Sequence, residues 1–236
     1  MNRWSALAGL LIIAAALALR VPALATRPLH NDEAVNAVKV SELWQHGRYT
    51  YDPDEYHGPA LHYATLPFLW LSGARNADEL HDATLRFAPV AFGVGLILLL
   101  LLFADGLGRH ALGWAGLFLA VSPAMGFYSR YFIHEMLLVF FTALTLGAGW
   151  RYTQTRHAGW AVVAGAGLGL MWATKETFVL ALGAMGLALL ATVAWTRPQG
   201  TALATLRGCW NGRHAALALA AAAGIWLAFF SSFCTN

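Results

Sequence analysis

Long apolar runs separated by short polar links dominate this sequence. Stretches with little or no charge recur seven times, each close to the roughly 20 residues that cross a bilayer as a helix. Helices are favoured there because each backbone N–H must bond within its own segment. The pattern predicts an all-α integral membrane protein with about seven transmembrane helices, at about 4–26, 84–104, 111–129, 132–150, 158–174, 177–196 and 214–234.

The first link is much longer than the others and covers residues 27–83. A helix is predicted from a cap at Asn31 or Asp32 to about His46, with Gly47 suited to the position after its end. One side of this helix is apolar and the other carries Lys39, Glu42 and Gln45, which is typical of a helix on a membrane surface.

A second amphipathic surface helix is predicted in the same link. It begins near Gly58-Pro59, because proline is favoured in the first helical turn, and continues through Trp70. Pro67 predicts a kink within it. We therefore expect residues 1–236 to form one membrane domain, with two short helices in its long first loop.

Composition agrees with this architecture. Only 11% of the 236 residues are charged and 58% are apolar, whereas a soluble domain carries about 25% charge. This excludes a nucleic-acid-binding domain, a disordered tail and an ordinary cytosolic enzyme. Cys209 and Cys234 are too few for a disulfide framework or a zinc site, so both are expected to be free thiols in or near lipid.

The distribution of charge predicts the orientation. With a cytoplasmic N-terminus, the inner segments carry only Asp105 as an acid, in agreement with the positive-inside rule. The loop 27–83 then faces outward and, with Asp82 inside it, holds nine of the 12 acidic residues. The arginines of the inner segments are Arg3, Arg109, Arg151, Arg156, Arg197, Arg207 and Arg213.

The acidic pair Asp32-Glu33 directly follows the outer end of the first membrane helix. Acids in the first turn of a helix commonly just satisfy free N–H groups and oppose the helix dipole. A carboxylate at this place could also act as a general base on a hydroxyl, or hold a divalent cation together with His30. The dipeptide alone leaves these alternatives open.

Other ionisable groups reach the same outer boundary in this topology. Charged groups at membrane depth are costly and suggest function, although a solvated turn, interface snorkelling and an ordinary surface histidine remain alternatives. Cations beside carboxylates suit binding of a lipid-carrier phosphate next to an activated acceptor. The candidate substrate-binding residues are His57, Arg130, Glu135, Lys175 and Glu176.

The order of these motifs resembles the GT-C superfamily of polytopic glycosyltransferases. Protein O-mannosyltransferases and the lipid A aminoarabinose transferase are similar, and a family of flippase-associated membrane proteins is the nearest in pattern. The motifs are His30-Asn31-Asp32-Glu33-Ala34, Tyr56-His57-Gly58-Pro59-Ala60-Leu61, Arg86-Phe87-Ala88-Pro89, Tyr128-Ser129-Arg130, His134-Glu135-Met136-Leu137 and Ala173-Thr174-Lys175-Glu176-Thr177.

The resemblance implies an inverting transfer of a sugar from a polyprenyl-phosphate donor to an acceptor, at the outer face of a prokaryotic plasma (inner) membrane. Asp32 matches the catalytic carboxylate of these enzymes, with Glu33 beside it. His57-Gly58-Pro59 matches a Lys-Pro-Pro that helps to bind carrier phosphate in the aminoarabinose transferase. Such proteins are longer, so this chain is expected to be an N-terminal part.

Two other functions are compatible with the sequence. A non-catalytic accessory of lipid-linked oligosaccharide flipping would use the same groups to recognise carrier without making bonds. An ion-coupled transporter is a weaker alternative, since it would place charges within helices rather than at their ends. The position of Asp32 discriminates: an enzyme needs this carboxylate open, with Arg130 or Lys175 nearby.

Overall fold

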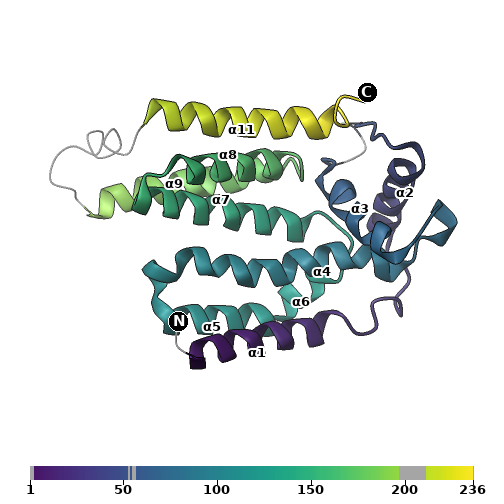
Figure 1. Cartoon of the computed structure of the whole chain (residues 1–236), viewed down its shortest axis with the longest axis horizontal. Coiled ribbons are helices and arrows are strands. Elements are labelled where there is room, and N and C mark those ends of the chain that lie inside the picture. Colours follow the sequence, from purple (N-terminus) through teal and green to yellow (C-terminus); the bar gives the residue numbers. More distant parts are fainter. Residues whose placement is uncertain (1–2, 53, 55–56, 197–210, 236) are drawn as a thin grey trace.

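The computed structural model describes residues 3–52, 54, 57–196 and 211–235, and these residues form helices joined by short links, with no strand. The prediction of an all-helical chain is therefore confirmed. Long helices run side by side and alternate in direction (Figure 1). They are α1 (Arg3–Arg20), α4 (Asp82–Leu99), α5 (Ala104–Val121), α7 (Glu135–Thr155), α8 (Ala158–Trp172), α9 (Phe178–Thr196) and α11 (Gly212–Phe230).

Three helical stretches of the described chain are long and apolar enough to cross a membrane: Asp82–Val121, Phe178–Trp195 and Gly212–Phe230. Two shorter apolar helices cover Ala6–Arg20 and Ala158–Trp172. The chain is thus a multi-pass membrane protein. The stretch Asp82–Val121 contains α4, the short helix η2 (Leu100–Phe103) and α5, and the chain reverses direction within it (Figure 1). The helical backbone is broken inside α5 at Gly108, which has φ +72° and ψ 161°.

The span predicted at 111–129 is interrupted in the structure. Helix α5 ends at Val121, and a separate short helix, α6, covers Pro123–Ser129. Pro123 has no N–H to donate, and it disfavours the helical conformation of the residue before it. Ser122 accordingly has ψ 124° and caps α6 by accepting a hydrogen bond from the N–H of Met125 at 3.4 Å.

Helix α1 does not continue to residue 26 as predicted, and its last residue is Arg20. Its side chain is buried between helices. It donates hydrogen bonds to the carbonyls of Ala120 at 2.7 Å and Leu119 at 2.8 Å, and to the hydroxyl of Ser129 at 3.1 Å. A buried guanidinium needs such partners, so Arg20 joins α1 to α5 and α6.

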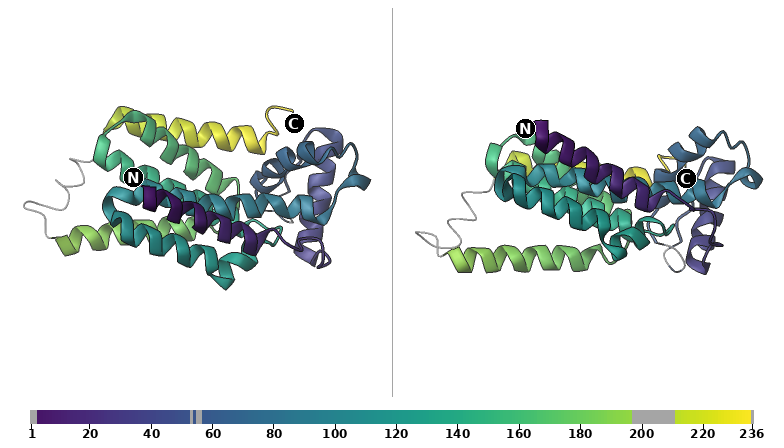
Figure 2. Two further views of the ribbon diagram at one scale, coloured as in Figure 1. Left: turned by 60° about the horizontal axis from the view of Figure 1, so that its bottom comes forward. Right: turned by 90° about the horizontal axis from the view of Figure 1, so that it is seen from below.

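Two helices of the first loop, α2 (Asn31–His46) and α3 (Ala60–Ser72), lie across one end of the bundle, where Figure 2 shows them from two further sides. Gly47 follows α2 with φ +69°, as predicted. The cap predicted at Asn31 or Asp32 was wrong, because His30 is the N-cap: His30 Nδ1 accepts from Asp32 N–H, while Glu33 accepts from His30 N–H. A short helix, η1, covers Ala77–Glu79.

This end of the bundle gathers segments that are far apart in the sequence. The end of α1, the start of α4, the start of α7, the end of α8 and the end of α11 all meet α2 and α3 there (Figure 1). A core cluster that includes Leu61, Leu85, Phe132 and Leu137 packs beneath the loop helices. The polar residues singled out in the sequence therefore stand on a packed base.

Candidate active site

Glu33 is the buried member of the acidic pair. Its side chain is 0% exposed, and its two oxygens accept hydrogen bonds from Arg86 Nε at 2.8 Å and Arg86 Nη2 at 2.9 Å. The amide of Phe132 donates at 2.9 Å, and Arg27 Nη2 at 2.8 Å. Burial raises the pKa of this carboxyl, but the bonds from Arg86, Phe132 and His30 outweigh burial and hold the pKa below its ordinary value.

Asp32 has the opposite surroundings. Its side chain is 62% exposed and lies 3.6 Å from His30 Nδ1. The hydroxyl of Tyr131 is 3.4 Å from Asp32 Oδ2 and 2.7 Å from His30 Nδ1. Burial, with Asp32 and Glu33 nearby, raises the pKa of Tyr131, so this phenol keeps its proton. Asp32 thus presents a carboxylate to solvent from the rigid first turn of α2.

A second group of ionisable side chains surrounds the link between α8 and α9. Lys175 Nζ donates to Glu135 Oε1 at 2.6 Å, and His57 Nδ1 lies 2.8 Å from Glu176 Oε2. These four side chains are 19% to 55% exposed, so none is sealed from solvent. The predicted convergence of His57, Glu135, Lys175 and Glu176 is therefore seen in the structure.

The segment from Tyr131 to Glu135 connects the two groups. Tyr131 contacts His30 and Asp32, and the amide of Phe132 binds Glu33. Glu135, four residues later, pairs with Lys175. An extended chain spans about 3.3–3.6 Å per residue, so the Cα atoms of Tyr131 and Glu135 are at most about 14 Å apart.

The His57-Gly58-Pro59 turn is clamped against the end of α8. The amide of Ala60 donates to Ala173 O at 2.8 Å, and Gly58 lies so near the Ala173 backbone that a Cβ would overlap it. His134 Nε2 donates to Gly58 O at 3.1 Å. Glycine is required here by close approach, and the turn fixes His57 beside Glu176.

Two further histidines lie buried under this turn. His62 and His134 are 1% and 2% exposed, and the ring of each lies edge-on to another histidine ring at 5.2–5.6 Å. Burial lowers the pKa of His62 to about 3 and that of His134 well below its ordinary value, with smaller effects of nearby positive charge. Both are therefore neutral supports at physiological pH.

Arg130 lies away from the Lys175 group. Its guanidinium donates to Pro22 O at 2.8 Å and to Leu19 O and Ala23 O at 3.3 Å, all just at or after the end of α1. Such cations commonly complete a helix C-terminus. The structure also adds Arg27, which the sequence reasoning did not include: it binds Glu33 and lies 5.0 Å from the Tyr131 ring centroid.

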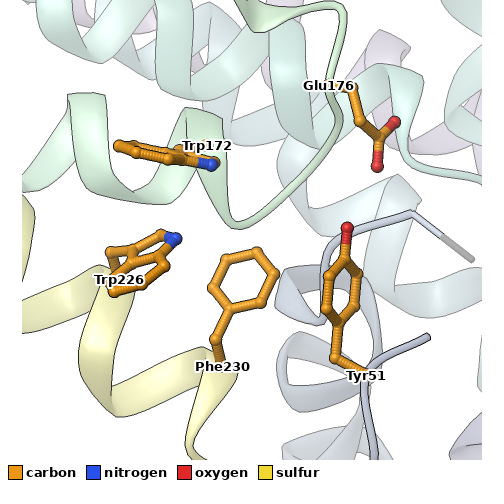
Figure 3. A pocket seen from close by; sticks show the side chains of 5 residues that line it. All are labelled: Tyr51, Trp172, Glu176, Trp226 and Phe230. Atoms are coloured by element: carbon orange, nitrogen blue, oxygen red, sulfur yellow. The ribbon is translucent and has the colours of Figure 1, made fainter. Parts of the chain in front are cut away.

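A cavity of about 280 Å³ lies beside Glu176, and its lining residues are labelled in Figure 3. Trp172 ends α8, Trp226 and Phe230 lie near the end of α11, and Tyr51 belongs to the first loop. Figure 3 shows the Tyr51 hydroxyl pointing toward the Glu176 carboxylate. The hydrophobic periodicity of the sequence can place Trp172 and Trp226 near the ends of two helices. It cannot predict that these two helix ends lie side by side.

The predicted metal ligands His30, Asp32 and Glu33 do not assemble a metal centre. Glu33 is occupied by two arginines and two amides. Within the described part of the chain, no three His, Cys, Asp or Glu side chains are placed to hold one ion. Hard divalent cations require several oxygen ligands, so we derive no step through a metal.

The chain is similar in fold to a solved glycosyltransferase. It superposes on a chain of the S. cerevisiae protein O-mannosyltransferase Pmt1–Pmt2 complex, bound to the sugar donor, with a TM-score of 0.71 and 16% identity. The match covers 99% of this chain and 34% of that one. At this identity the likeness shows the fold.

In sequence, the chain is similar to lipid A galacturonosyltransferase RgtD from Rhizobium johnstonii. The two are 36% identical over 85 residues, which cover 35% of this chain and 18% of that enzyme. No protein-family model matches the chain. Both comparisons point to glycosyltransferases with which this chain shares part of its length, and the nearness to flippase-associated proteins stays a prediction.

Proposed function

We propose that the chain belongs to a membrane glycosyltransferase of the inverting GT-C type, which moves a sugar from a polyprenyl-phosphate donor to an acceptor. The observation that carries this proposal is that Asp32 is exposed while its neighbour Glu33 is buried and ion-paired. An open carboxylate, Asp32, stands on a helix turn that a buried Glu33–Arg86 pair fixes in place. The two glycosyltransferase likenesses support the same class.

In this proposal Asp32 is the general base. It takes the proton of an acceptor hydroxyl as the hydroxyl oxygen attacks the anomeric carbon, opposite the phosphate. The bond between that carbon and the phosphate oxygen breaks, and the phosphate leaves with the bonding electrons. Glu33 acts as a positioning residue, because its oxygens are all turned inward toward donors. The anomeric configuration is inverted.

Cations would bind the phosphate as its charge develops. Lys175 has three N–H donors, one of which binds Glu135, and it lies beside His57 and Glu176. Arg27 binds Glu33 and lies over Tyr131 on the Asp32 side, while Arg130 binds carbonyls at the end of α1. Positive groups fixed beside a leaving phosphate stabilise the transition state more than the ground state. Glu135 and Glu176 orient Lys175 and His57.

We further propose that all seven long helices span the bilayer, with α2 and α3 on its outer surface. The N-terminus would then lie in the cytoplasm, and the Asp32 surface would face outward from the plasma (inner) membrane of a prokaryote. The arginine-rich inner segments support this orientation. Residues 1–236 would form one membrane domain.

The test is transfer of labelled sugar from a polyprenyl-phosphate donor in membranes that contain the chain. General-base catalysis commonly contributes about 10²–10⁴-fold, so Asp32→Asn is expected to lower the rate by about 100-fold or more. Asp54→Asn, which changes an exposed acid of the same loop, is the matched control. Unchanged transfer in Asp32→Asn would reject the assignment of the base.

The accessory function makes a different prediction in the same assay. A non-catalytic protein would bind the carrier phosphate and transfer no sugar, with or without the Asp32 carboxylate. The exposure of Asp32 favours the enzyme, because a carboxylate used only to complete a helix end would be turned toward the backbone. Carrier binding without transfer by any donor would favour the accessory.

A further inference from the structure

The cavity beside Glu176 combines aromatic faces with polar edges. Trp172 and Trp226 face each other with ring centroids 5.5 Å apart at 42°, and Phe230 lies 5.6 Å from Trp226. Tyr51 meets Phe230 edge-on at 4.7 Å. Trp172 remains 50% exposed, although it is large and apolar. Phe178 stacks on Trp172 with ring centroids 5.5 Å apart. The rings of Trp172, Trp226 and Phe230 therefore form a wall that remains partly open.

The polar groups of the cavity sit around this aromatic wall. Figure 3 shows the indole nitrogens of Trp172 and Trp226 turned toward Phe230 and the cavity, with the Tyr51 hydroxyl and the Glu176 carboxylate opposite. No described residue accepts a hydrogen bond from either indole N–H. Burial, together with Glu176 and Asp52, raises the pKa of Tyr51, which keeps its proton for donation.

We propose that this cavity binds the pyranose ring of a neutral hexose. The flat rings suit the C–H face of a sugar, while two indole N–H groups, a phenol and a carboxylate suit its hydroxyls. The inference rests on the proposed function and names the substrate class at the same surface, since Glu176 is bound to His57. Its volume, about 280 Å³, is near the lower limit of about 300 Å³ for small-molecule pockets.

A hydrocarbon chain of the lipid carrier is the competing occupant, and the polar groups argue against it. An isoprenoid offers no hydrogen bond to an indole N–H, a phenol or a carboxylate, so these groups would lose water without compensation. A sugar hydroxyl both donates and accepts, and it can satisfy each of them. The Glu176 carboxylate also predicts selectivity: it repels a sugar acid such as a hexuronate and accepts a neutral hexose.

The proposal is tested by saturation-transfer NMR on the purified chain in detergent micelles. The probes are methyl glycosides of glucose, galactose and mannose, the matching methyl hexuronides, and farnesyl phosphate. We expect signal at the ring C–H protons of at least one neutral hexoside, and less at its uronide. In Glu176→Gln, the uronide signal is expected to recover to that of the neutral sugar.

Tryptophan variants locate the binding site. Trp226→Ala is expected to weaken hexoside binding by about fivefold or more, because an aromatic contact is lost. Trp226→Phe keeps a ring and should bind within about twofold of the original. The matched control is Trp195→Ala, which removes an 88% exposed tryptophan of α9 far along the chain from the cavity. Thermal unfolding of each variant verifies that it is folded.

Three results would overturn the proposal: no hexoside signal, equal loss in Trp226→Ala and Trp195→Ala, or farnesyl phosphate alone contacting Trp172 and Trp226. The binding comparison between neutral sugar and uronide uses the unaltered chain, so it holds even if a variant misfolds. Sugar binding without any transfer would reject the proposed enzyme and keep this site. Sugar transfer without sugar binding at Trp172 and Trp226 would reject this site and keep the proposed enzyme.

Discussion

At the scale of single residues, two adjacent carboxylates have opposite environments. Asp32 is 62% exposed and Glu33 is 0% exposed, because successive positions on α2 point in different directions. The partner that decides this, Arg86, is 53 positions away in sequence. The sequence predicted that the pair matters, but it could not predict which acid is buried, since that depends on how α4 packs against α2.

Glu33→Gln is expected to destabilise the fold far more than Asp32→Asn. Removing one partner of a buried ion pair costs about 3–5 kcal/mol, because Arg86 then stays buried without a counter-charge. An exposed acid in a first helical turn contributes only about 0.3–1 kcal/mol. The measurement is unfolding of the two purified variants in the same detergent. Equal losses would contradict the role of Glu33 as a structural anion.

The buried histidines predict a pH dependence. The folded-state pKa of His62 is about 3, against an ordinary 6.5, so the unfolded chain binds more protons between these values. Stability is therefore full above about pH 6.5 and falls as pH decreases toward 3. Between pH 7 and pH 5 one such group costs about 2 kcal/mol.

His62→Phe is expected to reduce this loss, and denaturant midpoints at pH 7 and pH 5 measure it. Neither ring nitrogen of His62 has a partner among the described residues, so phenylalanine leaves no donor or acceptor unsatisfied at pH 7. Some slope remains, since the pKa of His134 is lowered for the same reason. An unchanged slope would show that His62 does not titrate as a buried group.

At the scale of elements, the long helices follow from apolar length, while their ends depend on individual residues. Pro123 separates α6 from α5, a signal that the sequence contained and the prediction of one span at 111–129 passed over. His30 caps α2 although histidine is not a common cap, because Glu33 returns a bond to the His30 amide. The bonds of this capping box are local, but histidine is not favoured at the N-cap, so residue preference placed the cap later, at Asn31 or Asp32.

Glycines decide how closely α8 and α11 approach. A Cβ added at Gly165 would overlap the backbone of Ala218, and one at Gly169 would come within 2.7 Å of Ala222 O. Gly165→Ala must push α11 away and is expected to cost about 1–3 kcal/mol. Gly183→Ala in α9 is the matched control: it meets no atom within 4 Å and should gain up to about 1 kcal/mol of helix propensity.

Unfolding of the two glycine variants in one detergent checks this contrast. From the most to the least stable, we expect Gly183→Ala, then the original chain, then Gly165→Ala. If both substitutions raise stability, α8 and α11 do not pack at glycine distance. Transfer activity is a second measurement. Trp172 on α8 and Trp226 on α11 line one cavity, and Gly165→Ala should move them apart and lower the activity.

At the scale of the whole molecule, the sparse charge is sorted to the two ends of the bundle. The helix ends that carry Asp32, Glu135 and Lys175 meet at one end, and Asp105 pairs with Arg151 at the other at 2.7 Å. The sequence could predict this sorting because alternating helices bring every second link to the same side. It could not predict the aromatic cavity, which requires α8, α11 and the first loop to meet.

The two cysteines of the chain test the orientation without added labels. Cys209 precedes α11 and lies outside the described residues, while Cys234 follows α11 and is exposed as a free thiol. If α11 crosses outward, a maleimide that cannot pass membranes should label Cys234 on intact cells, tested in Cys209→Ser. In Cys234→Ser, Cys209 should react only after the membrane is opened. The reverse pattern would turn the Asp32 surface toward the cytoplasm, and equal labelling of both would show that α11 does not span the bilayer.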